Sequence, residues 1–166
     1  MTNAAHAYTP AERIGSTALP EQVSRYLDGS DLLAKTQALR ISTVDAEGWP
    51  HASLLSAGDM LALASGRIRF IVFPQSTTNA NLMRDGRLTV TLSLDGGMCE
   101  LRMRCRPLLQ PSSDIPLAFF EAELLEVRVH KAPYAAVSGG VTFSVHEPQS
   151  VLPRWQKQIA AMKAAT

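Results

Sequence analysis

Residues 67–92 constrain the fold most, because they combine two strand patterns with a short helical pattern in one continuous run. Residues 68–73 are β-branched or aromatic with one arginine, which predicts a strand. Pro74 ends this strand, since proline has no N–H to donate to a neighbouring strand. Residues 87–94 alternate strictly between apolar and polar side chains, which predicts a half-buried strand. The fold must therefore contain a sheet with a helix inserted between two of its strands.

The inserted helix begins with three hydroxyl side chains, Ser76, Thr77 and Thr78. Residues 79–85 fit about two helical turns, and Gly86 suits the position after a helix end. The commoner interpretation is an ordinary Ser/Thr N-cap. The alternative is that these hydroxyls and the free N–H groups of the helix start bind an anion such as phosphate.

Further strands are predicted on both sides of this run. Residues 39–44 and 52–57 form a hairpin across a turn at residues 45–48, which argues against a βαβ layout. Residues 98–106 alternate again. Residues 119–130 also read as a strand, with a phase slip between Leu124 and Leu125 that indicates a bulge. A helix over residues 116–126 remains the competing interpretation there.

The rest of the chain predicts helices and one short strand. Residues 19–33 have a helical pattern whose first segment ends at Asp28-Gly29, residues 31–39 suggest a second short helix, and residues 141–145 suggest a last strand. Ser150 is placed to cap a C-terminal helix with Pro153 in its first turn. The apolar stripe of that helix consists of Val151, Trp155, Ile159 and Met162.

These elements predict a mainly β fold, a β-barrel with flanking helices, in one domain covering residues 1–166. Residues 1–18 have no periodicity and are expected to be a loose N-terminal segment, and residues 150–165 to be the C-terminal helix.

The composition excludes several functional classes. A formal net charge of +1 does not suit a nucleic-acid or membrane-surface protein. The chain has no apolar run of membrane-spanning length and no secretion signal at residues 1–6, so a cytoplasmic location is expected. Cys99 and Cys105 are expected to be buried, reduced thiols. Arg102, Arg104 and Arg106 share one face of their strand.

Motifs for metal or nucleotide chemistry are absent from the sequence. It contains no His-Glu-x-x-His, Cys-x-x-Cys, Walker A or Gly-x-Gly-x-x-Gly motif, and its four histidines are scattered. No metal site is therefore predicted, since a catalytic zinc needs three protein ligands. If the protein is an enzyme, a bound cofactor is expected to supply the difficult chemistry.

The sequence resembles the pyridoxamine 5′-phosphate oxidase-like family, whose members are FMN-binding split β-barrels. The resemblance is carried by an Asp-x-x-Gly-x-Pro motif at residues 45–50 and by a Ser-x-x-x-x-Asn-Leu-x-x-Asp motif at residues 76–85. It covers residues 36–109 well and residues 119–145 more loosely. It implies a homodimer with FMN bound at the interface between the subunits, and Arg102 and Arg104 are candidates for that interface.

The resemblance also implies a set of cofactor-binding residues. One strand would run beside the flavin, another would pass its ring, the helix start would hold the phosphate, and two further side chains would lie nearby. In this sequence the corresponding residues are Ser53, Leu54, Leu55, Ser56, Ile71, Val72, Ser76, Thr77, Thr78, Asn81 and Glu100. No catalytic residue is assigned.

This chain differs from the pyridoxamine phosphate oxidases at the positions that bind the FMN phosphate in those enzymes. Ser53, Thr77 and Thr78 stand where those enzymes carry basic side chains, and Glu100 stands where they carry a glutamine. Arg40, Arg67, Arg69 or an arginine of the partner subunit are the remaining candidates to supply positive charge. The sequence therefore predicts an FMN-dependent oxidoreductase with a small-molecule substrate, other than a pyridoxamine phosphate oxidase. The alternatives are a non-enzymatic barrel that binds flavin, haem or the deazaflavin F420, or one that binds no cofactor.

Overall fold

The computed structural model describes residues 8–14, 18–111 and 114–166. The strands are β1 (Glu12–Ile14), β2 (Leu39–Val44), β3 (Pro50–Leu55), β4 (Met60–Ala62), β5 (Ile68–Val72), β6 (Arg87–Leu94), β7 (Gly97–Leu108) and β8 (Ala118–His130). The helices are α1 (Glu21–Tyr26), α2 (Thr77–Asp85) and α3 (Pro148–Ala164).

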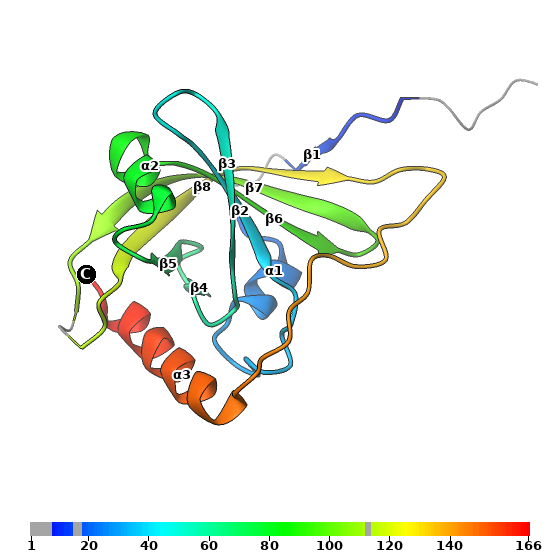
Figure 1. The fold of residues 1–166 in the computed structure, drawn as a ribbon. Helices are drawn as coiled ribbons and strands as arrows, with labels where there is room; N and C mark the ends of the chain where they lie inside the picture. The colour runs from blue at the N-terminus through cyan, green and yellow to red at the C-terminus, as the bar shows by residue number, and fades with distance from the viewer. Residues whose placement is uncertain (1–7, 15–17, 112–113) are drawn as a thin grey trace, which may run out of the picture.

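Within the described residues the strands form one antiparallel sheet in the order β3-β2-β6-β7-β8-β5-β4, with β1 paired to β8. The sheet curls into a half-barrel (Figure 1). Helix α2 connects β5 to β6, and α3 lies across the side of the molecule that carries β4 and β5. The predicted β-barrel with flanking helices is confirmed.

Two apolar clusters hold these layers together. The first fills the inside of the curled sheet, where the rings of Phe70 and Phe120 stack with centroids 5.4 Å apart. The second packs α3 against the sheet through Trp155, Ile159 and Met162, all buried. The predicted apolar stripe of the C-terminal helix is therefore the face that attaches α3, while Val151 is only half-buried at its end.

The long strand patterns were predicted correctly. In β7 and β8, Arg102 pairs with Glu126 whereas Met103 pairs with Leu124, so Leu125 has no opposite residue. This is the bulge that the phase slip indicated, and it excludes a helix over residues 116–126. The buried alternate residues of β6 and β7 include both cysteines.

Several local predictions were wrong. Helix α1 ends at Tyr26, close to the end predicted for the first segment at Asp28-Gly29. Residues 31–39 form no second helix, and Asp31 at their start adopts a positive φ angle that does not suit a helix. Residues 141–145 make only the isolated bridge from Thr142 to Gln37. Ser150 is not the N-cap, since α3 already begins at Pro148, whose fixed φ suits a first helical position.

Part of the N-terminal segment expected to be loose is ordered in the sheet, where Glu12 pairs with Val129. The remaining predictions for residues 1–7 and 15–17 lie outside the described residues. No helix in the described ranges combines the length and the hydropathy required to cross a membrane.

Candidate functional site

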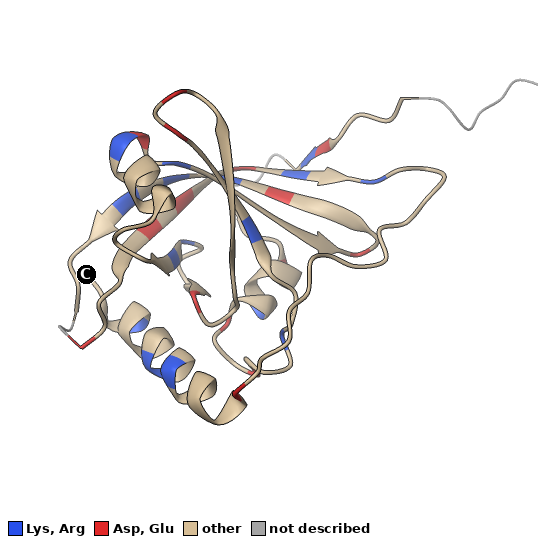
Figure 2. Cartoon of the chain, viewed as in Figure 1, with Lys and Arg blue, Asp and Glu red and all other residues tan. Residues whose placement is uncertain are grey.

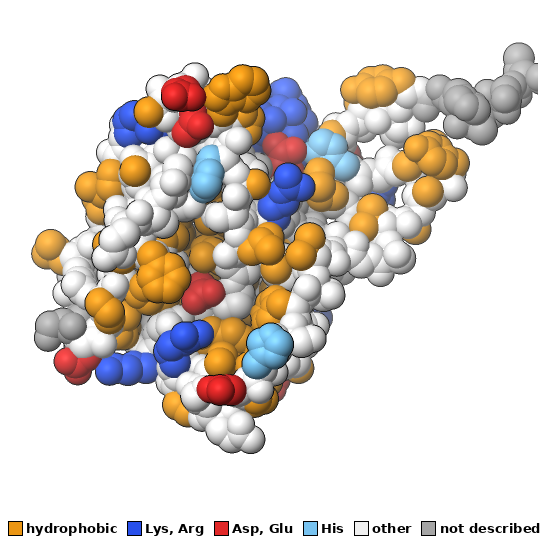
Figure 3. All heavy atoms as spheres, in the orientation of Figure 1, with side chains coloured by type: hydrophobic (Ala, Val, Ile, Leu, Met, Phe, Trp, Pro, Cys, Tyr) orange, Lys and Arg blue, Asp and Glu red, His pale blue; other side chains and the backbone are white. Residues whose placement is uncertain are grey.

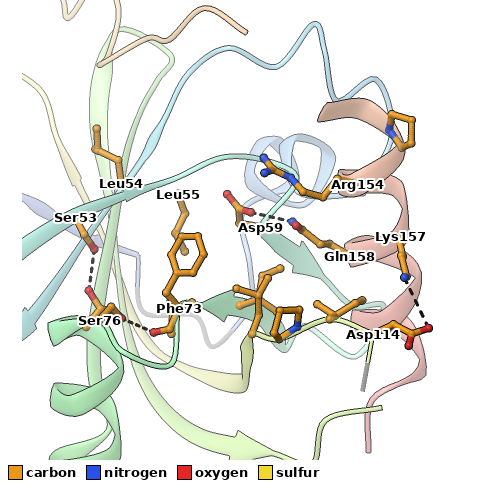
Figure 4. A pocket seen from close by; sticks show the side chains of 17 residues that line it. Ser53, Leu54, Leu55, Asp59, Phe73, Ser76, Asp114, Arg154, Lys157 and Gln158 are labelled. Carbon is orange, nitrogen blue, oxygen red and sulfur yellow. Dashed lines mark hydrogen bonds and ion pairs between the residues drawn. The ribbon is translucent and has the colours of Figure 1, made fainter. Parts of the chain in front are cut away.

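A cavity of about 670 Å³ lies between the sheet and α3. Its walls come from β3, β5, the start of α2, residues 114–117 and one face of α3 (Figure 4). Residues 114–117 are the segment that leads into β8. The space-filling view shows hydrophobic side chains gathered between α2 and α3, with basic side chains beside them on α3 (Figure 3).

Most of the cavity wall is apolar. Leu54 and Leu55 come from β3, and Ile71 and Val72 from β5. Phe73 adds an aromatic ring at the end of β5 and is 70% exposed. The remaining apolar lining residues are Ile115, Pro116, Leu117 and Pro153. Such walls suit a planar or hydrophobic ligand.

Hydroxyl groups occupy one end of the cavity. Ser53 Oγ of β3 lies 3.0 Å from Thr78 Oγ1 of α2, and Thr78 is buried. Ser76 Oγ accepts from the Asn79 N–H at 3.1 Å and donates to the Phe73 carbonyl at 2.7 Å. Ser76 is therefore the N-cap of α2, which confirms the commoner interpretation of this turn for Ser76.

The N-cap hydrogen bond of Ser76 satisfies only one of the backbone N–H groups at the start of α2. Thr77 and Thr78 occupy the first two helical positions, where backbone N–H groups have no acceptor within the helix. The positive end of the α2 dipole thus meets the hydroxyl groups of Ser53 and Thr78. The helix start therefore combines the Ser76 N-cap with donors of the kind that bind anions.

Helix α3 is attached to the opposite side of the cavity by buried polar contacts. Gln158 Nε2 donates to Asp59 Oδ1 at 2.9 Å and to the Gly58 carbonyl at 3.1 Å. Asp59 also accepts from the backbone N–H and the hydroxyl of Ser56, at 2.9 and 2.7 Å. The Trp155 ring covers Gly58 so closely that a β-carbon there would lie 2.2 Å from its Cγ.

The C-terminal end of α3 is held by Arg69. Its Nη1 donates to the Met162 carbonyl at 2.8 Å, and its Nε lies 3.0 Å from Glu121 Oε2. Glu121 is buried and also pairs with Arg67 and Arg106 at 2.9 and 2.7 Å. Burial alone would raise the pKa of Glu121, but the hydrogen bonds from Arg69, Arg106 and Arg67 outweigh it and hold the pKa below its usual value.

Charged side chains of α3 line the cavity, and the sequence reasoning did not identify them. Basic residues lie along α3 (Figure 2). Among them, Arg154 and Lys157 project from the helix, and Lys157 Nζ lies 3.9 Å from Asp114 Oδ2 (Figure 4). Their sequence spacing with Gln158 places all three on one face of a helix. That spacing could have identified the face, but it could not have shown that the face lies against β3 and β5. Of the expected sources of charge, Arg67 and Arg69 are engaged by Glu121, and Arg40 is not part of the lining.

The structure brings together most of the residues that the resemblance implied. Those that line the cavity are Ser53, Leu54, Leu55, Ile71, Val72, Ser76 and Thr78. Ser56 lies beside it, bonded to Asp59, and Thr77 is exposed outside the lining.

Two implied residues make their contacts elsewhere. Asn81 is buried and donates from Nδ2 to Thr43 Oγ1 of β2 at 2.9 Å, so it attaches α2 to the sheet. Glu100 of β7 pairs with Arg102 at 2.7 Å and with His130 at 2.9 Å. Within the described residues, no three His, Cys, Asp or Glu side chains are grouped so that they could hold a metal ion.

Comparisons with known proteins agree with this fold. No protein-family model matches the chain. The chain is 32% identical over 148 residues to the uncharacterised protein YclD of Bacillus subtilis (strain 168), and the match covers 87% of this chain and 96% of YclD.

Solved structures show the fold at much lower identity. A pyridoxamine 5′-phosphate oxidase-like protein of Lactobacillus delbrueckii superposes with a TM-score of 0.54 at 15% identity, over 70% of this chain and 98% of that one. HupZ of Group A Streptococcus superposes with a TM-score of 0.52 at 12% identity, over 72% of this chain and all (100%) of the other. This chain therefore belongs to the same family as YclD, and its fold is the split β-barrel of the pyridoxamine 5′-phosphate oxidase-like proteins.

Proposed function

We propose that the cavity between the sheet and α3 binds FMN and that the protein is a flavin-dependent oxidoreductase acting on a small molecule. The observation that carries this proposal is the convergence of β3, β5 and the α2 start on one cavity. Residues that the sequence resemblance assigned to a flavin site, separated along the chain, line the same space. Its volume of about 670 Å³ falls within the roughly 300–1,000 Å³ typical of small-molecule sites.

The residues of the cavity fit the two chemically different parts of FMN. Leu54, Leu55 and Val72 offer apolar surface to the flavin ring. Thr78, Ser53 and the backbone N–H groups at the α2 start, which have no acceptor within the helix, offer donors to the phosphate.

When bound, FMN would supply the hydride transfer. The chain's own contribution would be to orient the ring and to exclude water with the apolar wall. Asp59 is the carboxylate that Gln158 of α3 contacts, and its oxygens also accept from Ser56. We therefore assign it a positioning role.

The phosphate end lacks a basic side chain, and this sets the expected affinity. Neutral hydrogen bonds contribute only about 0.5–1.5 kcal/mol each, whereas bonds to charged groups contribute about 1.5–3 kcal/mol. FMN should therefore bind only modestly more tightly than riboflavin, which has the same ring system but no phosphate.

We further propose that the protein works as a homodimer. Leu54 and Phe73 line the cavity, yet 52% of Leu54 and 70% of Phe73 is exposed. Large apolar side chains at the mouth of a site are suited to cover by a second subunit. Light scattering should give about twice the 18.0 kDa chain mass. A monomer at micromolar concentration would argue against a shared site.

A second candidate function is flavin binding without catalysis. The hydroxyl groups of Ser53 and Thr78 bond to each other, and Ser76 bonds within its own turn. These hydroxyl groups could therefore contact a ligand, but none of them is placed to act as a general acid or base. Reduction of the bound flavin by NADH or NADPH, followed at the flavin absorbance band, separates the two functions, because a pure binding protein should not accelerate it.

The test of the cofactor site is a fluorescence titration of FMN and riboflavin against the wild type, Thr78→Val and Thr77→Val. Thr78→Val removes the hydroxyl that faces the cavity with little change in shape. It should weaken FMN by about 2- to 10-fold, the equivalent of one neutral hydrogen bond. Thr77→Val is the matched control, since Thr77 is exposed outside the lining. Failure of the wild type to bind either flavin would refute the proposed function.

A further inference from the structure

The two polar ends of the cavity lie on opposite sides of its apolar middle. Ser53 and the α2 start are on one side, Arg154 and Lys157 of α3 are on the other, and Leu55 and Phe73 lie between them (Figure 4). In the proposed function, the FMN phosphate lies only at the hydroxyl end. The basic end therefore needs its own explanation.

Arg154 is the charge at this end with no partner of opposite sign. Its guanidinium makes no ion pair or hydrogen bond with the rest of the described residues, although it projects toward the cavity. Lys157 differs, because Asp114 lies 3.9 Å away. That pair is weak, since the two side chains are 56% and 71% exposed and solvent screens their attraction.

Within the described residues, neither carboxylate of the cavity lining forms an ion pair with Arg154. Asp59 is turned onto the Gln158 amide and the Ser56 hydroxyl, at 2.9 and 2.7 Å. Asp114 lies beside Lys157. An oxyanion entering from the solvent would therefore meet Arg154 as the strongest available donor, with five N–H groups in a planar fork.

We propose that Arg154, assisted by Lys157, binds an anionic group of the small-molecule substrate, and that the substrates are apolar or aromatic oxyanions. This inference rests on the proposed function, because it assigns the hydroxyl end to the cofactor and the α3 end to the substrate. The apolar middle accepts the substrate body, and the guanidinium fork selects the planar or tetrahedral oxyanion. Since α3 is held by Gln158 and Arg69, Arg154 is carried on a helix with a fixed position.

The test compares two fluorescent probes that differ in one charge. Anilinonaphthalenesulfonate carries an aromatic body and a sulfonate, and N-phenyl-naphthylamine has the same rings without the charge. Arg154→Gln should weaken the sulfonate probe at least about tenfold and leave the neutral probe within about twofold. Arg154→Lys should give an intermediate loss, because it keeps the charge but not the fork. Lys163→Gln is the control, an exposed cation of the same helix outside the cavity lining, and should change neither probe.

Equal effects of Arg154→Gln on both probes, or none on either, would overturn the inference. A flavin titration separates it from the proposed function. If the ratio of FMN to riboflavin affinity stays at the wild-type value in Arg154→Gln, the inference stands. If the ratio falls to one, Arg154 holds the cofactor phosphate and the substrate assignment is wrong. If no variant binds flavin while the probe discrimination persists, the proposed function fails and the anion site at α3 remains.

Discussion

Gln158 of α3 donates its side-chain amide to the Asp59 carboxylate at 2.9 Å, across a separation of 99 residues in sequence. The same amide donates to the Gly58 carbonyl. This relationship fixes α3 over the sheet and brings its basic side chains to the cavity. Substitutions at this junction should therefore affect both stability and ligand binding.

Replacing Gln158 by Met should destabilise the fold. Met preserves most of the volume but leaves the Asp59 carboxylate and the Gly58 carbonyl without their donor. We expect the free energy of unfolding to fall by about 1–3 kcal/mol, measured by urea denaturation. Gln156→Met is the matched control, because Gln156 is exposed on the same helix and should change stability by less than about 0.5 kcal/mol. Equal losses in the two variants would mean that the Gln158 contact contributes nothing specific.

A methyl group at position 58 should displace α3. In Gly58→Ala the new carbon would lie 2.2 Å from the Trp155 ring, so the helix or the loop must move. Overpacking of this kind costs about 1–3 kcal/mol. The shift in Trp fluorescence and the denaturation midpoint should report it. Gly139→Ala, where a β-carbon meets nothing within 4 Å, should behave as wild type. A stable Gly58→Ala variant with an unchanged Trp spectrum would contradict this packing.

The ion pairs of Glu121 with Arg67, Arg69 and Arg106 should make the free energy of unfolding depend on pH in the acidic range. Because hydrogen bonds from three arginines outweigh burial and lower the pKa of Glu121 in the folded state, its contribution is complete above the ordinary glutamate pKa of about 4.3. That contribution is lost as the pH falls through the lowered pKa. Glu121→Gln should therefore lower stability at neutral pH, by up to about 3 kcal/mol, and flatten the stability profile at acidic pH.

Glu123→Gln is the control for this cluster, since Glu123 is exposed on the same strand. Denaturation midpoints measured from neutral to acidic pH provide the comparison. If Glu121→Gln and the wild type lose stability in parallel as the pH falls, Glu121 is not the group responsible.

Both cysteine thiols should react slowly while the protein is folded. Burial, with a smaller effect of the Glu100 charge, raises the pKa of Cys99 to about 11. Burial also raises the pKa of Cys105 to about 12, although Arg104 partly opposes it. Labelling with a thiol-reactive chromophore at pH 8 should be slow in buffer and complete in denaturant. Rapid labelling of either thiol in the folded protein would place it outside the core.

Local sequence patterns were enough to predict the longer strands and the α2 turn, but not the three-residue strands β1 and β4. Alternation in residues 87–94 and 98–106 follows directly from burial of one face of a sheet. The phase slip at Leu125 revealed the bulge, because a side chain out of register must turn to the other face. Ser76 was recognisable as a cap because capping is a contact between residues close in sequence.

The composition of the cavity could not be predicted in the same way. Arg154 reaches it because Gln158 meets Asp59 and Arg69 meets the end of α3, and all of these contacts join residues far apart in the chain. Asn81, which the resemblance assigned to the cofactor site, hydrogen-bonds to Thr43 of β2, a contact that the local pattern did not indicate. Periodicity specifies which face of an element is buried, but the partner of that face depends on how the whole sheet curls and where α3 returns to it.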